Sequence, residues 1–579
     1  SQFVHKSTNK GNSWTIISPD LTTNDTTKQN QDKSGGLTID ATGAENHTTL
    51  LVIEPSALEK GVIWAGSDDG YIHVTRDGGA TWTNVAKNIK GVPAGSWVNQ
   101  IKASRYNKGE AVAVINNYRR FDFKPYLMRT KDYGKTWTSM ASENDIFGYA
   151  LSFIQDPVEP KLMFFGTEHG LYISIDEAKT WAKFENGYPS VSTMDLVIQE
   201  RESDLVIGTF GRAIYVLDDI KPLRVLAAKG QKSVTESAVT AIDASTSYMV
   251  STRAASGPAN PGNATFEGEN RESGAAVIKF FAKKPDTSAG GRGAAGAAPQ
   301  PQARAGGQGG GGGRGGRGGA GGGNTPRGPQ AKIEIFDLSG NLVRTLSSSI
   351  NEGLNSVSWR YDENPPENTV QPELPPGVPA QFASFFRRGG APALPGAYTF
   401  KVTIGDQSDE GKIEIQMDPR DTYDMNNLIA RRDLLREVNV LSADVSALSS
   451  KISKDMESVD KVIEALKGKR GPEVNALRTK SEEVKKEMKE LSDAVGSGGG
   501  FRFGGGSDSD VVPLNSKVTG LSRTISGSFD APGAADRKDL TDFNNEFKSL
   551  QSKVDAWYAA NWDAYLAAVK TVDFSPIGG

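Results

Sequence analysis

The chain of 579 residues contains no cysteine and only four histidines, His5, His47, His73 and His169. The lack of cysteine excludes a disulfide framework, a thiolate metal site and a cysteine nucleophile. No two histidines are close enough in sequence to form a local metal motif. No apolar run approaches the roughly 18 residues that a membrane span requires. We therefore expect no metal, no cofactor and no cysteine-based catalysis.

An excess of charge of one sign is also missing. The chain has 66 Lys and Arg against 70 Asp and Glu, a net charge of -4, whereas a dedicated nucleic-acid binder usually carries a basic excess. The glycine-rich stretch 290–328 has five arginines in a pattern similar to RNA-binding RGG segments, but it has no aromatic residue for base stacking. We interpret it as a long surface loop and predict no nucleic-acid partner.

Short apolar runs bounded by Gly, Asn or Asp predict β-strands throughout residues 1–225. Within this region the pattern Ser/Thr-x-Asp-x-Gly-x-Thr-Trp repeats. Two clear copies and two degraded copies occur, at Thr75–Trp82, Thr130–Trp137, Ser7–Trp14 and Ser174–Trp181. Their tryptophans lie 44 to 68 residues apart, which suits one four-stranded propeller blade per copy.

The repeated pattern, which we call the box, has a local physical explanation. Its Asp carboxylate accepts hydrogen bonds from the amides of its own turn, its Gly supplies a positive φ, and its Trp inserts a large rigid face between sheets. These residues are therefore predicted to be structural and not catalytic. They are Asp77, Gly79, Trp82, Asp132, Gly134, Trp137, Asp176 and Trp181.

A second repeat predicts the hairpin turn between two inner strands of each blade. It occurs at Gly66–Ile72, Gly166–Tyr172 and Gly208–Tyr215. Its turns contain four candidates for chemistry, the carboxylate pair Asp68 and Asp69, the imidazole of His169 and the guanidinium of Arg212. Turn capping or ordinary surface exposure is the simpler explanation of these four side chains. The sequence therefore assigns no catalytic residue.

The remainder of the chain changes character twice. Residues 226–419 predict an immunoglobulin-like β-sandwich with two flexible or disordered insertions, at 290–328 and 365–395. Residues 420–579 keep apolar side chains at a 3/4 spacing and predict an antiparallel helical bundle with a Gly-rich gap at 496–506. Near the C-terminus, Trp562 and Tyr565 are candidate interface residues. The predicted fold class is thus multidomain and mainly β.

The box resembles the Asp-box, or bacterial neuraminidase repeat, of sialidases, xyloglucanase-type glycoside hydrolases and sortilin-type propellers. A wider likeness, carried by His5–Thr22, Asp122–Leu127 and Leu205–Asp219, is to large exported bacterial proteins, many from Bacteroidota, labelled sortilin-like or "glycosyl hydrolase" propellers. In that group an immunoglobulin-like module and a helical region similarly follow the propeller. The resemblance implies that this chain is the C-terminal portion of such a protein and holds the last four to five propeller blades. Upstream blades would then be a partner that closes the propeller ring.

Two functions remain open at this point. The first is an exported, non-catalytic scaffold that binds proteins or peptides, as a subunit of an outer-membrane or cell-surface complex. Its location would be the periplasm or surface of a Gram-negative bacterium, and its partners would include membrane-embedded proteins. The alternative is a glycoside hydrolase of the sialidase or xyloglucanase type acting on polysaccharide. Such an enzyme needs two carboxylates about 5 to 10 Å apart in an aromatic-lined cleft.

Overall fold

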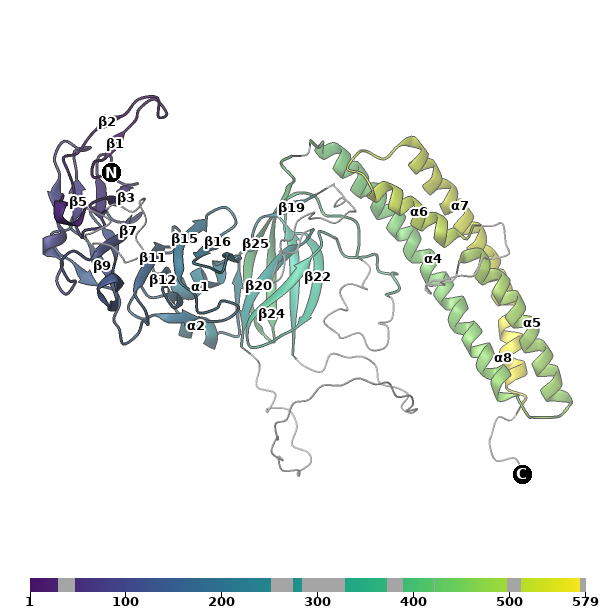
Figure 1. Ribbon diagram of the computed structural model, residues 1–579. Coiled ribbons are helices and arrows are strands. Elements are labelled where there is room, and N and C mark those ends of the chain that lie inside the picture. Colours follow the sequence, from purple (N-terminus) through teal and green to yellow (C-terminus); the bar gives the residue numbers. More distant parts are fainter. Residues whose placement is uncertain are drawn as a thin grey trace, which may run out of the picture. The chain divides into compact units, whose positions relative to one another are not determined.

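The computed structural model describes residues 1–29, 47–250, 274–283, 329–371, 389–420, 422–496 and 512–572. It divides into two compact units, Ser1–Ser245 with Lys279–Phe281, and Thr246–Ile278 with Ala282–Gly579. Propeller sheets form the first unit, and a β-sandwich and a helical bundle belong to the second (Figure 1). The predicted fold class is therefore confirmed. The insertion at 290–328 lies outside the described residues, as do residues 372–388 and 497–506 of the other two predicted interruptions.

The first unit contains three four-stranded antiparallel sheets, one three-stranded sheet and a two-stranded hairpin among its described residues. The hairpin is β1 (His5–Lys6) and β2 (Thr15–Ile16), followed by the 3-10 turn η1 (Thr26–Lys28). The first sheet is β3 (Leu50–Pro55), β4 (Ile63–Ser67), β5 (Ile72–Thr75) and β6 (Thr83–Asn84), followed by η2 (Ala86–Asn88). The second is β7 (Trp97–Ala103), β8 (Ala111–Asn117), β9 (Asp122–Thr130) and β10 (Thr138–Ser139), with η3 (Tyr118–Arg120) between β8 and β9. The third is β11 (Ala150–Gln155), β12 (Met163–Thr167), β13 (Gly170–Ser174) and β14 (Ala182–Phe184). The fourth is β15 (Thr193–Gln199), β16 (Asp204–Thr209) and β17 (Ile214–Leu217).

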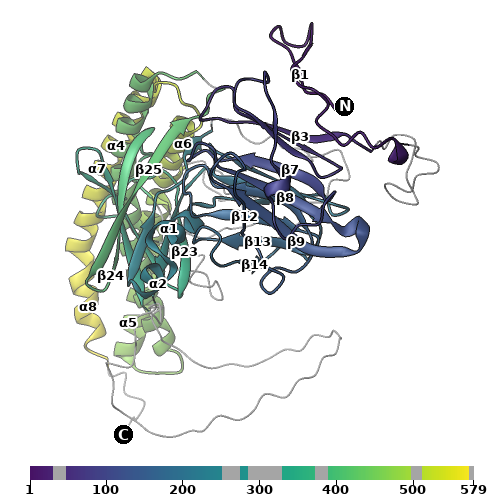
Figure 2. The same cartoon turned by 90° about the vertical axis from the view of Figure 1, so that its left-hand side faces the viewer.

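Successive sheets of the first unit pack face to face, as the second and third sheets do in Figure 2. The first strand of each sheet contacts the first strand of the next, from β3 through β7 and β11 to β15. Fully buried side chains fill the space between neighbouring sheets, such as Phe164 and Leu171 of the third sheet against Leu196 of the fourth. This packing explains the near-continuous apolar runs of the second strands, because both faces of these sheets are covered.

The box turns have the hydrogen bonds that the sequence pattern predicts. The Asp77 carboxylate accepts hydrogen bonds from the Thr81 amide (2.9 Å), the Thr81 hydroxyl (2.6 Å) and the Thr75 hydroxyl (2.7 Å). These hydrogen bonds lower the pKa of Asp77 to about 2. Equivalent bonds form at Asp132 and Asp176. Asn9 of the most degraded copy still accepts from the amide of Ser13 at 2.9 Å.

Box tryptophans connect each sheet to the one before it. The indole N–H of Trp82 donates to the carbonyl of Ile17 at 2.9 Å, and that of Trp181 donates to the carbonyl of Met140 at 2.8 Å. Each acceptor directly follows the last strand of the preceding sheet. The indole of Trp137 instead packs edge-on against Trp64 of the first sheet, with ring centroids 6.3 Å apart.

Two short helices, α1 (Lys221–Lys229) and α2 (Gln231–Glu236), follow β17 and precede β18 (Val239–Ile242). The sequence did not predict them, and α1 crosses the predicted boundary between residues 225 and 226. Arg224 of α1 donates through its Nε to both carboxylate oxygens of the fully buried Asp156, at 3.1 and 3.0 Å. Helix α1 is thereby attached to the loop that follows β11.

The sandwich of the second unit has a five-stranded sheet in the order β19-β25-β24-β21-β22. Its strands are β19 (Ser247–Met249), β21 (Gln330–Asp337), β22 (Leu342–Ser349), β24 (Gly396–Ile404) and β25 (Gln407–Met417), while β20 (Ala276–Ala282) and β23 (Gly353–Trp359) pair in another sheet. The Asp337 carboxylate caps the predicted turn by accepting from the Asn341 amide at 2.9 Å. At the end of the insertion predicted at 365–395, Ala391 and Ala393 are buried.

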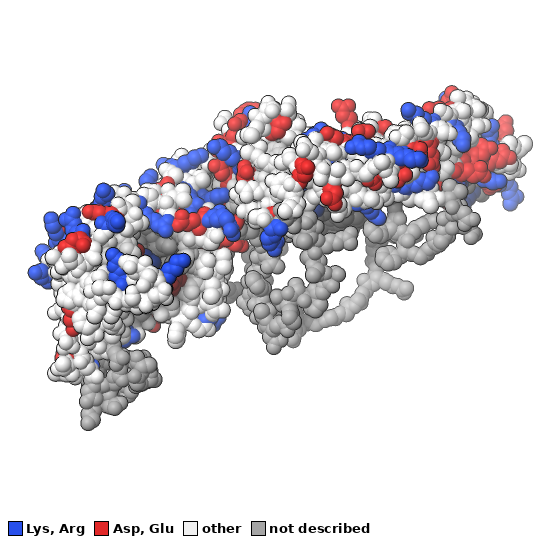
Figure 3. All heavy atoms as spheres, turned by 90° about the horizontal axis from the view of Figure 1, so that it is seen from above, with Lys and Arg blue, Asp and Glu red and all other residues white. Residues whose placement is uncertain are grey.

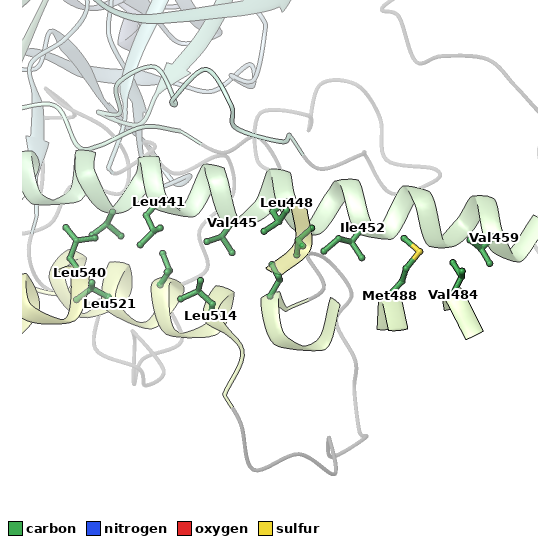
Figure 4. Close-up of a cluster of buried hydrophobic side chains, with 14 of the residues drawn as sticks. Leu441, Val445, Leu448, Ile452, Val459, Val484, Met488, Leu514, Leu521 and Leu540 are labelled. Carbon is green, nitrogen blue, oxygen red and sulfur yellow. The ribbon is translucent and has the colours of Figure 1, made fainter. Parts of the chain in front are cut away.

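Over the described residues the bundle consists of four helical segments, a 41-residue helix and three that pack along it. They are α4 (Met425–Ala465), α5 (Pro472–Val495), α6 (Leu514–Ser526) and α7 (Ala534–Trp557), which continues through a π-helical turn (Tyr558–Trp562) into α8 (Asp563–Val569). Gly468 and Gly471 adopt positive φ between α4 and α5. Figure 4 shows Leu514, Leu521 and Met488 packed along α4. No helix of the described ranges is long and apolar enough to cross a membrane.

The structure corrects the prediction that Tyr565 is an interface residue. Its side chain is buried in the bundle core, and its hydroxyl lies 3.0 Å from the Ser481 hydroxyl. Trp562 is half-buried and packs its ring between those of Tyr558 and Tyr565. The apolar stripe of α7 therefore continues past Trp557, through Trp562 and Tyr565, into α8.

Candidate binding edge of the propeller sheets

Each sheet of the first unit has two distinct ends. In the three four-stranded sheets the box turn lies at one end. In all four sheets the turn between the second and third strands lies at the other end, next to the start of the first strand. Equivalent backbone bonds define this second end, which we call the turn end. The amides of Asp68, Glu168 and Phe210 donate to the carbonyls of Thr49, Tyr149 and Ser192, at 3.0, 3.1 and 2.9 Å. All four sequence candidates, Asp68, Asp69, His169 and Arg212, lie in these turns.

The carboxylate pair at the turn end of the first sheet is buried, and its oxygens accept hydrogen bonds from nearby amides and hydroxyls. Asp68 accepts from the amide and hydroxyl of Thr49, at 2.8 and 3.1 Å, and burial raises its pKa. Asp69 accepts from the amide and hydroxyl of Thr23, at 2.6 and 2.7 Å, and from the hydroxyl of Ser67 at 2.5 Å. Both carboxylates therefore hold local structure and are not presented to a substrate.

Two histidines that the sequence analysis did not single out lie beside this pair. His47 Nδ1 is 3.8 Å from Asp68 Oδ2, and both side chains are buried. His73 stands on β5, where burial lowers its pKa while the charges of Asp69 and Asp20 oppose the shift. Among the described residues no group of three or more His, Asp or Glu is placed to hold a metal ion. His73 lies in an apolar strand and belongs to no motif, so the sequence gave no sign that it lies beside the carboxylate pair.

Aromatic side chains gather at the turn ends of the second, third and fourth sheets. Four of them are strongly exposed, Phe121 (88%), Phe210 (75%), Phe147 (68%) and Phe123 (51%). We call this set the aromatic edge. It comprises Trp97, Tyr118, Phe121, Phe123, Phe147, Tyr149, His169 and Phe210.

Ring contacts join members of the aromatic edge within sheets and, at Tyr118 and Tyr149, across two sheets. Tyr118 of the second sheet stacks on Tyr149, which precedes β11 of the third, with centroids 4.5 Å apart. Phe147 stacks on His169 at 4.4 Å. The Arg119 guanidinium lies 3.2 Å from the centroid of the Trp97 ring, a cation–π contact that extends the surface. Burial raises the pKa of Tyr149 to about 12, with the charge of Glu168 as a second cause.

The β8–β9 hairpin exposes aromatic rings at and beside its turn. Its turn closes with Phe121 in the left-handed region, at φ +59°, where the Phe121 amide donates to the Tyr118 carbonyl at 2.9 Å. Arg120 fixes the hairpin by donating to the carbonyls of Ala94 (2.7 Å) and Gly95 (2.9 Å). Left-handed φ is unfavourable for a bulky residue and recurs at functional sites. Phe121 therefore combines a strained backbone conformation with a strongly exposed ring.

The turns of the third and fourth sheets complete the edge. Gly148 leaves room for His169, because a Cβ on Gly148 would lie 2.9 Å from the imidazole ring. His169 Nε2 is 3.6 Å from the carboxylate of Glu168. Arg212 is exposed two residues after Phe210. Charges of both signs are interspersed on the face of the molecule that Figure 3 shows. The aromatic edge can therefore bind apolar or flat groups flanked by charge.

No protein-family model and no curated protein matches the chain. Among solved structures it is similar to YCF48 from Cyanidioschyzon merolae, at 16% identity over 29% of this chain and 52% of that one, with a TM-score of 0.22. It is also similar to a GH74 xyloglucanase from Xanthomonas campestris (9% identity, 48% and 38% covered, TM-score 0.26). An ancestral GH74 enzyme is a further neighbour (11% identity, 61% and 36% covered, TM-score 0.28).

These neighbours are β-propeller proteins, so the likeness concerns the fold alone. The chain spans about half the length of the YCF48 structure that it matches. Another YCF48 structure is bound to a D1 peptide, whereas the GH74 proteins are enzymes. At this level of similarity the comparisons favour neither binding nor hydrolysis for the present chain.

Proposed function

We propose that this chain is a non-catalytic scaffold that binds protein or peptide partners through the aromatic edge. The observation that carries the proposal is the exposure of Phe121, Phe147 and Phe210 at the turn ends of three different sheets. Clustered exposed aromatic residues characterise protein interfaces, because rigid rings bury a large area at a small cost in conformational entropy.

The chemistry at the turn ends supports binding over hydrolysis. Glycoside hydrolases need two accessible carboxylates that act as acid and base or nucleophile. The adjacent pair Asp68 and Asp69 is buried, and its oxygens accept hydrogen bonds from Thr49, Thr23 and Ser67. A hydrolase remains the second candidate, because exposed rings such as Phe147 also suit stacking against sugars.

Location and partner identity complete the proposal. Following the resemblance of the box segments, we place the protein outside the cytoplasm, with partners in an outer-membrane or cell-surface complex. Further propeller sheets are proposed as another partner. The support for them is apolar exposure at both ends of the sheet series, at Trp14 (62%) and Ile16 (56%) of the hairpin and at Ile214 (69%) and Val216 (53%) of the fourth sheet.

The test is purification of the protein from its native envelope in mild detergent, with mass spectrometry of the proteins that co-purify. We expect a stoichiometric partner that the double variant Phe121→Ala/Phe147→Ala loses. Leu338→Ala is the matched control, because Leu338 is equally exposed (77%) but lies in the β21–β22 turn of the sandwich. A partnerless wild-type protein would contradict the scaffold, and release of sugar from a polysaccharide panel would favour the hydrolase.

A further inference from the structure

Asn186 and Gly187 form the only Asn-Gly pair in the chain. In such a pair the backbone amide of the glycine can attack the side-chain amide of the asparagine and close a five-membered succinimide ring. Glycine favours this attack, because it has no Cβ to hinder the approach and its backbone rotates freely. In a folded protein the reaction therefore depends on whether the surrounding structure holds these two groups apart.

The structure leaves both reacting groups unrestrained. The pair lies between Phe184, the last residue of β14, and the buried Tyr188. Asn186 and Gly187 are both exposed, and neither the Asn186 side chain nor the Gly187 amide makes a hydrogen bond with another described residue. A Cβ placed on Gly187 would meet no atom within 4 Å. The loop therefore has room to bring the amide nitrogen to the side-chain carbonyl carbon.

The pair Asp77–Gly78 could close the same ring, and there the structure holds both groups. The Gly78 amide, which would be the attacking group, donates to the Gly61 carbonyl at 3.0 Å. The Asp77 carboxylate accepts hydrogen bonds from Thr81 and Thr75 of its box. These bonds would have to break before the ring could close. The box turn is therefore protected against the reaction.

The other Asp-Gly pair of the chain, Asp69–Gly70, is held in a similar way. The Asp69 carboxylate accepts from the amide and hydroxyl of Thr23, and the Gly70 amide donates to the Ser67 carbonyl at 3.3 Å. A Cβ on Gly70 would lie 2.7 Å from the Cα of Gly95, so this turn is also closely packed. Of the three pairs, Asn186–Gly187 alone combines a free nucleophile, a free side chain and open space.

We propose that Asn186 is a site of spontaneous covalent modification, which converts it to aspartate and isoaspartate. The Gly187 nitrogen bonds to Cγ of Asn186, the Cγ–Nδ2 bond breaks, and ammonia leaves with the proton of the Gly187 amide. Water then opens the ring. Opening at Cγ gives aspartate, and opening at the backbone carbonyl gives isoaspartate. The net reaction consumes water and releases ammonia, so it needs no enzyme and no other co-reactant.

The modification changes the turn end between the third and fourth sheets. It adds a negative charge there, and isoaspartate also lengthens the main chain, because the chain then runs through the side-chain methylene. Ser192 of the same loop donates to the Glu168 carbonyl (3.2 Å) and accepts from the Phe210 amide (2.9 Å). The modified loop is thus joined directly to two turns that carry the aromatic edge. The proposal concerns the chemistry of the loop and holds whatever that edge binds.

The test is incubation of the full, folded chain at neutral pH, followed by tryptic digestion and mass spectrometry of the peptide 184–201. We expect two products that differ in retention time, both heavier by the difference between a hydroxyl and an amino group. A synthetic peptide 184–201 gives the unrestrained rate. The folded chain should convert within about threefold of that rate, because a segment without contacts opens at almost no cost. The tryptic peptide 77–87, which contains Asp77–Gly78, should stay unchanged.

Two variants separate the chemistry from backbone strain. Gly187→Ala should lose most of the conversion, because its Cβ hinders the attack. Gly211→Ala is the matched control, since Gly211 also has positive φ (+84° against +72° for Gly187) and open space around it. It should convert Asn186 at the wild-type rate.

Three results would overturn the proposal. The first is a folded chain that keeps the Asn186 amide while the synthetic peptide converts. The second is conversion of Gly187→Ala at the wild-type rate. The third is isomerisation of Asp77 in the folded chain as fast as the conversion of Asn186, because hydrogen bonding would then not decide which pair reacts.

Discussion

The strained, exposed ring of Phe121 allows folding and binding to be separated by a single substitution. At φ +59° a side chain other than glycine costs roughly 1–2 kcal/mol, and at 88% exposure the ring buries almost no area. Phe121→Gly should therefore raise the free energy of unfolding by about 1 kcal/mol, allowing for the larger entropy of a glycine in the unfolded chain. For a unit of this size that corresponds to a melting temperature about 2–4 °C higher.

The same substitution should weaken binding. Removing one aromatic anchor from an interface costs about 1.4 kcal/mol or more, which is roughly a tenfold loss of affinity. The assay compares the melting curve of the purified protein, followed by tryptophan fluorescence, with the amount of partner recovered from the envelope. Phe121→Ala is the matched control, because it loses the ring but keeps the left-handed strain. It should lose the partner with no gain in stability.

Two results would refute this reasoning. If Phe121→Gly melts at a lower temperature than wild type, the ring stabilises the fold and the hairpin is not strained for the sake of exposure. If the variant is more stable and recovers the partner in full, the aromatic edge is not the binding surface.

Three further predictions concern buried polar groups. Asp156→Ala should lower the free energy of unfolding by about 3–5 kcal/mol in a denaturant titration, because it leaves the Arg224 guanidinium without its buried carboxylate; a loss below about 1 kcal/mol would contradict this. Burial lowers the pKa of His73, so its contribution to stability is present above the unfolded pKa near 6.5 and is lost as the pH falls from there through the folded pKa; His73→Gln should flatten the dependence of melting temperature on pH between 7.5 and 5.5. Tyr565→Phe should cost about 1 kcal/mol, by thermal melting, because it removes the hydroxyl that meets Ser481, and an unchanged melting temperature would speak against that bond.

Local patterns proved the most predictable part of this molecule. The box turns could be predicted because their hydrogen bonds join residues at most four positions apart, as between Asp77 and Thr81. The long helices were equally visible, since a 3.6-residue period persists over the 41 residues of α4. Both signals are contained within one element and need no knowledge of its neighbours.

Features that depend on neighbours were missed or wrong. The aromatic edge joins Trp97, Tyr118 and Tyr149 from two sheets, and nothing in their spacing indicates that they meet. Tyr565 was predicted at the surface, because the sequence does not show that α5 supplies Ser481 beside it. Asp68 and Asp69 were visible as a pair, but their burial depends on Thr23, 46 residues before Asp69.

The indole bonds of the box tryptophans give the series of sheets a direction. Trp82 reaches back to Ile17 and Trp181 reaches back to Met140, so each of these tryptophans takes its acceptor from a sheet made earlier in the chain. During synthesis from the N-terminus, each new box tryptophan emerges when its acceptor has already been translated. Sheets can therefore be added one at a time onto a finished template, without waiting for a later segment.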